Sequence, residues 1–548
     1  MQGRTLPKNA KTSLTNNSTL EAKNGKVDQD AVGKIWNKNT VQAGTTIDMT
    51  STDADIQNDA NVTAGTGTIT MSAKTAIDNS NDSPITVSSK SGGISLTAGT
   101  NIKNDIVNAG GAVSMDTVTN NGTTIENTGA VTAGGTLTEK AKTTLTNSAA
   151  VKAATGITME AGNSISNGST VEATGGAIAM TATNNGITNT GAVTATGESS
   201  SVSMSATNTS AGAIQNDANV TAGNGITMTA GTTIDNSNNS LLVSSAKGGI
   251  SLTAGTSITN DAVTASAGSV SMTANKGNIT NNGALQALGT SSTVNLTAKD
   301  SSAGAITNNA NVTAGNGITM TADTAIDNSN SSLVVSSTSG DITLTAGTSI
   351  TNDAVTANAG SVSMTATNNG ITNNGAVQAI GDNSSVSMSA TNGSAGAISN
   401  SEAVSAGTSV TMTAGTSISN AAVMGNAGSV SMTATNAGIT NNGDVKAIGD
   451  SSSISMTATN NVSGAISNSG IVSAGKDVTE TAGTTLTNTG AVTASKGAID
   501  QDAGGKLWNK VAVQAGTTID MTSTGADIQN DANVTAGTGI TMGVFHCH

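Results

Sequence analysis

Apolar residues recur along this chain in short alternating segments rather than in helix-like stripes. One segment reads Ile/Val-x-Met-x-Ala, as in Ile226–Ala230, and sixteen of the eighteen methionines have Ile or Val two residues earlier. A second reads apolar-x-Asn, as in Ile214-Gln215-Asn216, and a further apolar residue such as Val220 follows it. Period-two alternation of β-branched residues predicts strands with one buried face, and Thr and Ser suit the outward positions. The pattern therefore predicts an all-β fold.

The segments repeat at long range with reproducible spacing. A motif beginning at Ala211 returns at Ala303 and at Ala395, each time 92 residues later. Isoleucines that mark successive segments are spaced 20, 24, 21 and 27 residues in the first two blocks, and the third block lacks the 24-residue member. A stack of similar coils tolerates such an excision, whereas a globular core rarely does.

We therefore expect a right-handed parallel β-helix, that is, a solenoid, of about 23 coils. The irregular coil lengths and the lack of a hexapeptide rule favour the right-handed form over the left-handed one. At a strand spacing of roughly 4.8 Å, the rod would be on the order of 110 Å long.

Asparagine occupies the third position of almost every apolar-x-Asn segment. Its amide can bond along a stack, and Asn tolerates turn geometry, so we interpret these residues as a structural ladder rather than a ligand site. Methionine fills irregular cores, and we prefer that interpretation to a track for soft metals. The ladder is predicted to include Asn58, Asn127, Asn216, Asn236, Asn260, Asn281, Asn308, Asn328, Asn352 and Asn373.

Length variation is confined to a few Gly- and Ser-rich loops, which we expect to project from one ridge. Loops on a rigid scaffold are where repeat proteins usually make contacts. The candidate contact residues are Glu198, Thr290, Asp382 and Asp450.

Three regions are expected: an unpatterned leader (1–10), a continuous β-helical repeat rod (11–542) and an unpatterned tail (543–548). The segment 34–38 recurs at 506–510, an offset of 472 residues. This recurrence, with no polar capping coil visible, suggests an alternative function as a filament protein that assembles end to end with itself.

Composition and charge exclude several classes of protein. The 548-residue chain has a net charge of −14, and its only arginine is Arg4, so we expect no nucleic-acid partner. The only cysteine, Cys547, excludes an intramolecular disulfide framework. No apolar run is long enough for a transmembrane segment, and residues 1–20 lack the apolar core of a signal peptide. We expect an exported protein whose N-terminal export region is missing here.

Little in the sequence points to chemistry. Asp78, Asp82, Asp235 and Asp327 lie in polar corners that offer calcium ligands, but no committed bidentate acid accompanies them. His546, Cys547 and His548 could bind zinc adventitiously, without a scaffold. Both histidines are terminal and the acids are scattered one to a coil, so we expect no enzyme, no metal site and no cofactor.

The outward Thr and Ser rows suggest one more function, binding to ice. Thr227 and Thr229 are examples of such a row. Strand propensity on a solvated face explains the rows as well. Ser271, Asn295 and Asp48 at the same positions blur the regular lattice that ice binding needs, which disfavours this alternative.

The repeat running from Ile125 through Asn127 and Val131 to Thr138 resembles those of filamentous haemagglutinin-like exoproteins of bacterial two-partner secretion. The resemblance covers residues 11 to 542 and implies a right-handed parallel β-helix at, or released from, a Gram-negative-type cell surface. It also implies an outer-membrane transporter as secretion partner and a receptor on a host or neighbouring cell. The chain departs from the family in having no signal peptide, secretion domain or toxin. We expect an extracellular structural or adhesive rod that gives reach and display.

Overall fold

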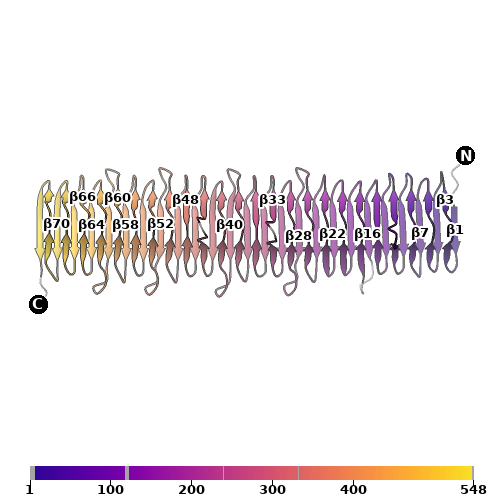
Figure 1. Ribbon diagram of the computed structural model, residues 1–548, viewed down its shortest axis with the longest axis horizontal. Coiled ribbons are helices and arrows are strands. Elements are labelled where there is room, and N and C mark those ends of the chain that lie inside the picture. Colours follow the sequence, from indigo (N-terminus) through magenta and orange to yellow (C-terminus); the bar gives the residue numbers. More distant parts are fainter. Residues whose placement is uncertain (1–5, 118–122, 239, 331, 546–548) are drawn as a thin grey trace. The chain divides into compact units, whose positions relative to one another are not determined.

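The computed structural model describes residues 6–117, 123–238, 240–330 and 332–545. These residues form strands, turns and bends, with no helix among them. The chain divides into two compact units, residues 1–268 and 269–548, and each is a stack of similar turns (Figure 1). Unit 1 contains strands β1 (Leu6–Ala10) to β36 (Ala262–Ala265), which make twelve turns of three strands. Unit 2 contains β37 (Val270–Ala274) to β73 (Gly539–Val544), which make twelve turns and one further strand.

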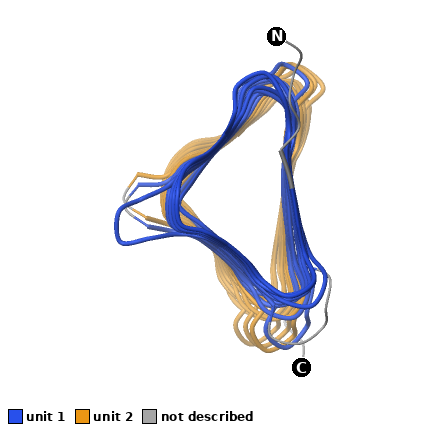
Figure 2. Cartoon of the chain, turned by 90° about the vertical axis from the view of Figure 1, so that its right-hand side faces the viewer, with its two compact units in different colours: residues 1–268 blue, residues 269–548 orange. Residues whose placement is uncertain are grey.

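Each turn contributes one strand to each of three parallel sheets. In unit 1, β28 (Val202–Ala206) lies in sheet A, β29 (Ile214–Asn216) in sheet B and β30 (Val220–Ala222) in sheet C. In unit 2, β40 (Thr293–Ala298), β41 (Ile306–Asn308) and β42 (Val312–Ala314) repeat this order. Viewed along the stack, each unit has three sides that meet at three corners (Figure 2). The predicted fold class is confirmed as an all-β parallel β-solenoid, with about 25 turns where about 23 were expected.

Neighbouring turns pair residue for residue, so like side chains stack on like. In unit 1, β31 (Ile226–Ala230) pairs with β34 (Ile250–Ala254) through Ile226 with Ile250 and Met228 with Leu252. In unit 2, β43 (Gly317–Ala322) pairs with β46 (Ile342–Ala346) in the same way. A shift of one residue would turn each apolar set outward, which is why the alternation fixes this register.

The core of each unit consists of seven inward columns. Sheet A contributes Ile or Val, then Met or Leu, then Ala; sheet B contributes Ile and Asn; sheet C contributes Val and Ala. Met228 and Met364 are fully buried, as are Ile258 and Val377. Burying one such large side chain contributes about 1.5–3 kcal/mol, so stacking supplies what a single turn cannot. The methionines of sheet A thus fill the core, as predicted, except Met542 in the last strand, which is 48% exposed; Met424, in sheet C, lies on an outward position.

The corners bring the backbones of adjacent turns into close contact. A Cβ on Gly255 would lie 1.8 Å from the carbonyl oxygen of Gly231, one turn earlier. Gly225, just before β31, and Gly317, the first residue of β43, have φ angles of +128° and +145°, which L-residues rarely adopt. Glycine is therefore required at these corners by geometry.

The strands extend past the predicted boundaries at both ends. β1 (Leu6–Ala10) pairs with β4 (Val27–Ala31), and β73 (Gly539–Val544) pairs with β70 (Thr518–Ser523). In β1, Lys8 pairs with Gln29 at the position where most sheet A strands have Met. Because neither residue is apolar, the sheet A pattern could not be recognised within the expected leader. The single continuous rod from 11 to 542 stays a prediction. His546, Cys547 and His548 lie outside the described residues.

Candidate functional site

The predicted contact loops lie at one corner, between a sheet C strand and the next sheet A strand. Each is a tight Gly-x-x-Ser turn in which the Ser N–H donates to the Gly carbonyl, at 2.8 Å for Ser200 and Gly197 and at 2.9 Å for Ser384 and Gly381. The serine is buried and the two middle residues point to solvent. All four predicted residues are exposed, namely Glu198, Thr290, Asp382 and Asp450. Their role in contact stays a prediction.

A second row of loops lies at the opposite end of the same sheet A strands, where the chain passes to sheet B. Asn208 Oδ1 accepts the backbone N–H of Ser210 at 2.8 Å, and Gly212 N–H donates to the Asn208 carbonyl at 2.8 Å. Asp300, Asn392 and Asn460 close equivalent loops in unit 2 with the same backbone bond. Extra length also occurs at the third corner, between sheet B and sheet C, as between β32 (Ile234–Asn236) and β33 (Leu242–Ser245). It is therefore found at three ridges, whereas the sequence suggested one.

Four long turns carry both loops, and the loop pair borders the outer face of one strand at its two ends. One lies in unit 1, at β28, and three lie in unit 2, at β40, β52 (Val386–Ala390) and β61 (Ile454–Ala458). In unit 2 an aliphatic residue precedes each Gly-x-x-Ser turn and stays exposed: Leu288 at 49%, Ile380 at 56% and Ile448 at 57%. Val462, on the second loop of the last long turn, is 90% exposed. These side chains are spaced singly and make no continuous apolar patch.

Ion pairs brace the first row of loops in each unit. Lys247 Nζ lies 2.9 Å from Glu198 Oε2 and lowers the pKa of that carboxyl below its ordinary value by a charged hydrogen bond. In unit 2, Lys496 Nζ lies 2.5 Å from Asp450 Oδ2. Each pair joins corners two turns apart. Surface pairs of this kind contribute little stability, so they fix loop position rather than the fold.

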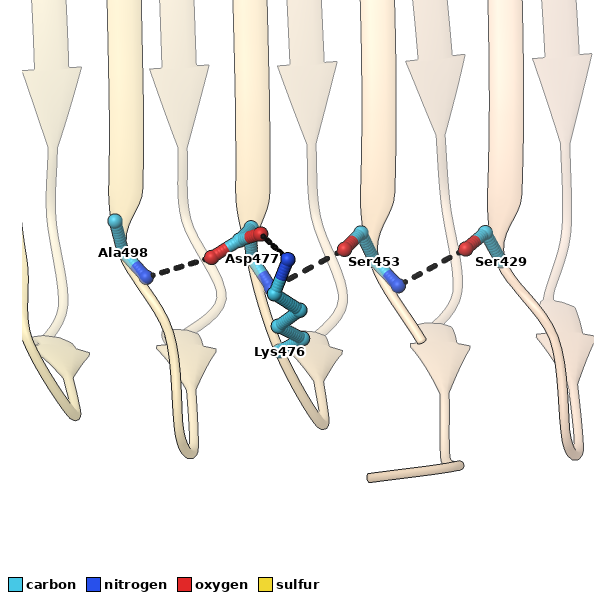
Figure 3. A network of polar contacts seen from close by, with 5 residues as sticks. All are labelled: Ser429, Ser453, Lys476, Asp477 and Ala498. Atoms are coloured by element: carbon cyan, nitrogen blue, oxygen red, sulfur yellow. Dashed lines mark hydrogen bonds and ion pairs between the residues drawn. The ribbon is translucent and has the colours of Figure 1, made fainter. Parts of the chain in front are cut away.

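The same corner carries a polar ladder that follows the stack in unit 2 (Figure 3). Ser453 N–H donates to Ser429 Oγ at 3.1 Å, and Asp477 N–H donates to Ser453 Oγ at 3.3 Å. Asp477 Oδ1 then accepts from Ala498 N–H at 3.0 Å, and Lys476 Nζ lies 3.1 Å from Asp477 Oδ2. These side chains pair backbone N–H groups at the edge of the strands, which is a structural role.

The asparagine ladder is confirmed. In unit 2 each amide Nδ2 donates to the Oδ1 of the next turn from Asn281 to Asn530; Asn352 to Asn373 measures 2.9 Å and Asn373 to Asn400 measures 2.7 Å. All ten predicted members are buried. Asn236 pairs with Asn260 in the sheet register, and the turn of Asn216 pairs with that of Asn236 through Ile214 and Ile234.

The ladder is interrupted twice in unit 1. The Oδ1 atoms of Asn167 and Asn236 are buried without a hydrogen-bond partner. Before the first gap, Asn147 Nδ2 donates to Glu139 Oε2 at 2.9 Å. Before the second, Asn216 Nδ2 donates to the Ala218 carbonyl at 2.8 Å. The amides at both gaps therefore point to other acceptors.

Two buried glutamates were missed from the sequence. Glu139 and Glu480 replace Met in the sheet A column and are fully buried. Asn127 Nδ2 donates to Glu139 Oε1 at 2.8 Å, and Asn468 Nδ2 donates to Glu480 Oε1 at 2.7 Å. Burial raises the pKa of Glu139 to about 7 and raises that of Glu480, although the amide hydrogen bonds oppose this. The sequence did contain a signal for them, because each glutamate stands two residues after Leu or Val, just as the core methionines stand two residues after Ile or Val.

The calcium candidates do not converge on a site. Asp78, Asp235 and Asp327 each accept the N–H and Oγ–H of the serine two residues on, as in Asp235 Oδ1 with Ser237 Oγ at 2.5 Å. Asp82 borders a hollow that also contains Lys103 and Asp105. In the described parts of the chain, no three Asp, Glu, His or Cys side chains come close enough to hold a metal ion.

Two outward clusters surround the tryptophans, one in each unit. Trp36 has Lys38 Nζ 4.0 Å from its ring centroid and donates from its indole N–H to Asp59 at 2.7 Å. Trp508 has Lys506 and Lys510 Nζ each 4.1 Å from its ring centroid. The indole N–H bonds, Trp36 to Asp59 and Trp508 to Asp531, join adjacent turns. The lysines flank each tryptophan in its own turn, and since they lie over the rings, they leave little ring face open for sugar stacking.

Comparison with known proteins returns no match to a family, to a curated protein or to a solved structure. The described residues also contain no helix with the length and hydropathy to cross a membrane. The geometry itself therefore carries the functional argument.

Proposed function

We propose that this protein is a structural rod, exported to a bacterial surface, which holds its corner loops at a distance from the cell. The observation that carries the proposal is the division of roles within each turn. Inward positions repeat the same few side chains, while corner positions differ in loop length and charge. A scaffold selected for reach needs the repeated inward side chains, because they let similar turns stack without limit. A scaffold selected for contact needs corner loops that differ in length and charge.

The resemblance to filamentous haemagglutinin-like repeats supports export by an outer-membrane transporter and contact with a receptor on another cell. The acidic, hydrophilic composition suits an exposed fibre, because like charge keeps copies apart. An outer-membrane transporter gene beside the gene for this protein would support this route.

The length of the particle tests the rod directly. Residues 303–394 span four turns, and their removal joins Ser302 to Ala395, which is equivalent to Ala303. Negative-stain images should show a particle shorter by roughly 19 Å, at about 4.8 Å per turn. An unchanged length, or a rounded particle, would refute the rod. Open-ended fibres would instead favour the self-assembling filament.

Labelling of intact cells tests the location. Antibody against the loops at Asp382 and Asp450, which are exposed, should label unbroken cells that produce the full-length protein and its transporter. Labelling that requires lysis would contradict surface display. A strain without the transporter is the matched control and should lose the label.

A further inference from the structure

Glu139 and Glu480 are each enclosed by groups that cannot take a charge. Glu139 lies on β19 (Leu137–Ala141), between Met115 on β16 (Val113–Thr117) and Met159 on β22 (Ile157–Ala161). Glu480 lies on β64 (Val478–Ala482), between Met456 on β61 and Gln501 on β67 (Ile499–Ala503). Neither carboxyl has a buried cation beside it. An ionised carboxylate in such a place loses its hydration without a countercharge.

The side chains that face both carboxyls from the other two sheets are also uncharged. For Glu139 they come from β17 (Thr124–Asn127), β20 (Thr144–Asn147), β18 (Val131–Ala133) and β21 (Val151–Ala153). For Glu480 they come from β62 (Ile466–Asn468), β65 (Leu486–Asn488), β63 (Val472–Ala474) and β66 (Val492–Ala494). Their inward residues are Ile, Leu, Asn, Val and Ala. Charged residues on all these packed strands lie on outward positions: Asp116, Glu126, Lys140, Lys152 and Glu160 near the first carboxyl, and Asp500 and Asp502 near the second.

The hydrogen bonds and the burial act in opposite directions. Both oxygens of Glu139 accept from ladder amides, and Glu480 accepts from Asn468, Asn488 and, at 2.7 Å, Gln501. Acceptance at both oxygens suits the ionised form, whereas the dry core suits the neutral form. Burial is the larger effect at both residues, so the pKa of each carboxyl is raised.

We propose that Glu139 and Glu480 make the turns around them proton-responsive, so that each unit is firm when its carboxyl is neutral and opens locally when the carboxyl ionises. In unit 1 the responsive turn coincides with the first gap in the ladder. Asn147 donates to Glu139 there, and the Oδ1 of Asn167 on the next turn has no partner. The junction between the turns of Asn147 and Asn167 therefore lacks the side-chain amide hydrogen bond that helps an uninterrupted junction of the ladder to resist opening.

The sign of the effect follows from linkage. The folded-state pKa of Glu139, about 7, exceeds its ordinary value of 4.5, so the folded chain binds more protons between these two values. The contribution of Glu139 to the free energy of unfolding is therefore fully present below about pH 4.5 and is lost as the pH rises through about 7. The direction is the same for Glu480.

Hydrogen exchange on the full chain, resolved to peptides, tests the proposal. Between pH 5 and pH 8.5, the local opening equilibrium around β19 and β20 should rise roughly 100-fold beyond the intrinsic pH effect, given tenfold per pKa unit. Glu139→Met, which restores the residue of neighbouring turns, should abolish that rise while the region of β64 still responds. Glu480→Met should give the reverse result.

Two further variants complete the test. Glu126→Gln removes an exposed carboxyl on the adjacent strand and should leave the response of β19 and β20 unchanged. Glu139→Gln keeps the shape of the side chain and replaces the methionine variant if that does not fold. An equal pH response in the wild type and in the Glu139 variant would overturn the proposal, as would a flat response in the wild type.

Discussion

At the residue scale, the most constrained position is the inward asparagine of sheet B. An apolar residue there would fill space but could not bond along the stack, and a serine would be too short. Asn373 shows the full arrangement, because its Oδ1 accepts from Asn352 and its Nδ2 donates to Asn400. In a core without water, removing one partner of such a hydrogen bond costs more stability than the bond itself contributes, because the other partner is left buried and unsatisfied.

Substitution Asn373→Ala should therefore destabilise the turns around it by roughly 3 kcal/mol. It leaves a buried donor on Asn352 and a buried acceptor on Asn400 without their ladder partner, and each orphaned group costs about 1–3 kcal/mol. Hydrogen exchange of the flanking strands measures the effect. Thr372→Ala, on the outward face of the same strand, is the control and should change stability by less than about 0.5 kcal/mol. Equal effects of the two substitutions would show that the ladder adds nothing.

Residue patterns predicted the strands and the ladder because both depend on local periodicity. Ile-x-Asn and Ile-x-Met show in sequence which side chains point inward, and stacking follows when the pattern repeats. The pattern failed for Glu139 and Glu480, because a charged residue at a core position looks like an interruption rather than a member of the column. The gaps at Asn167 and Asn236 could not be predicted either, since they depend on which acceptor a neighbouring amide faces.

At the scale of the strand and loop, the length of a turn in sequence predicts that a loop is longer but does not predict its position. A 27-residue interval shows that a turn is longer, yet it does not say which of three corners takes the extra residues. The loops closed by Asn208 and Asp300 were missed for this reason, although Asx-type closure is a local signal. The sheet strands themselves hardly change, because their register with both neighbouring turns fixes them.

Removal of one whole turn should therefore be tolerated. Deletion of residues 326–349 takes out β44 (Ile326–Asn328), β45 (Val334–Ser337) and β46, and joins Ala325 to Ile350, the next marker isoleucine. Because every new neighbour is equivalent to the old one, circular dichroism should show the same strand signal, and melting should shift by only a few degrees.

Deletion of residues 326–337 is the contrasting variant. It removes β44 and β45 but keeps β46, so two sheet A strands would follow one another without the intervening sides. Core residues of that turn would face solvent, and we expect aggregation or a loss of protection throughout the flanking turns. Equal tolerance of both deletions would contradict a stack in strict register.

At the scale of the whole molecule, stability is a sum over turns and the contacts between them, as in other solenoids. Within each unit the turns pair with their neighbours, and no described turn depends on a distant part of the chain for its hydrogen bonds. Cooperative unfolding of all 548 residues in one step is therefore not expected.

Residues 1–268 and 269–548, produced separately, should each fold. Every inner turn of a unit keeps both of its neighbours within that unit, so its hydrogen-exchange protection should match that in the whole chain. A cut inside a unit should speed exchange only in the turns beside it, because an end turn there loses one of its two sets of inter-turn hydrogen bonds and half of its stacking contacts. Residues 1–230, which end within unit 1, serve as a check on this logic: the loss should again be local to the cut. If either unit is unfolded alone while the whole chain is folded, stability is shared over long range, and the additive view of the solenoid is wrong.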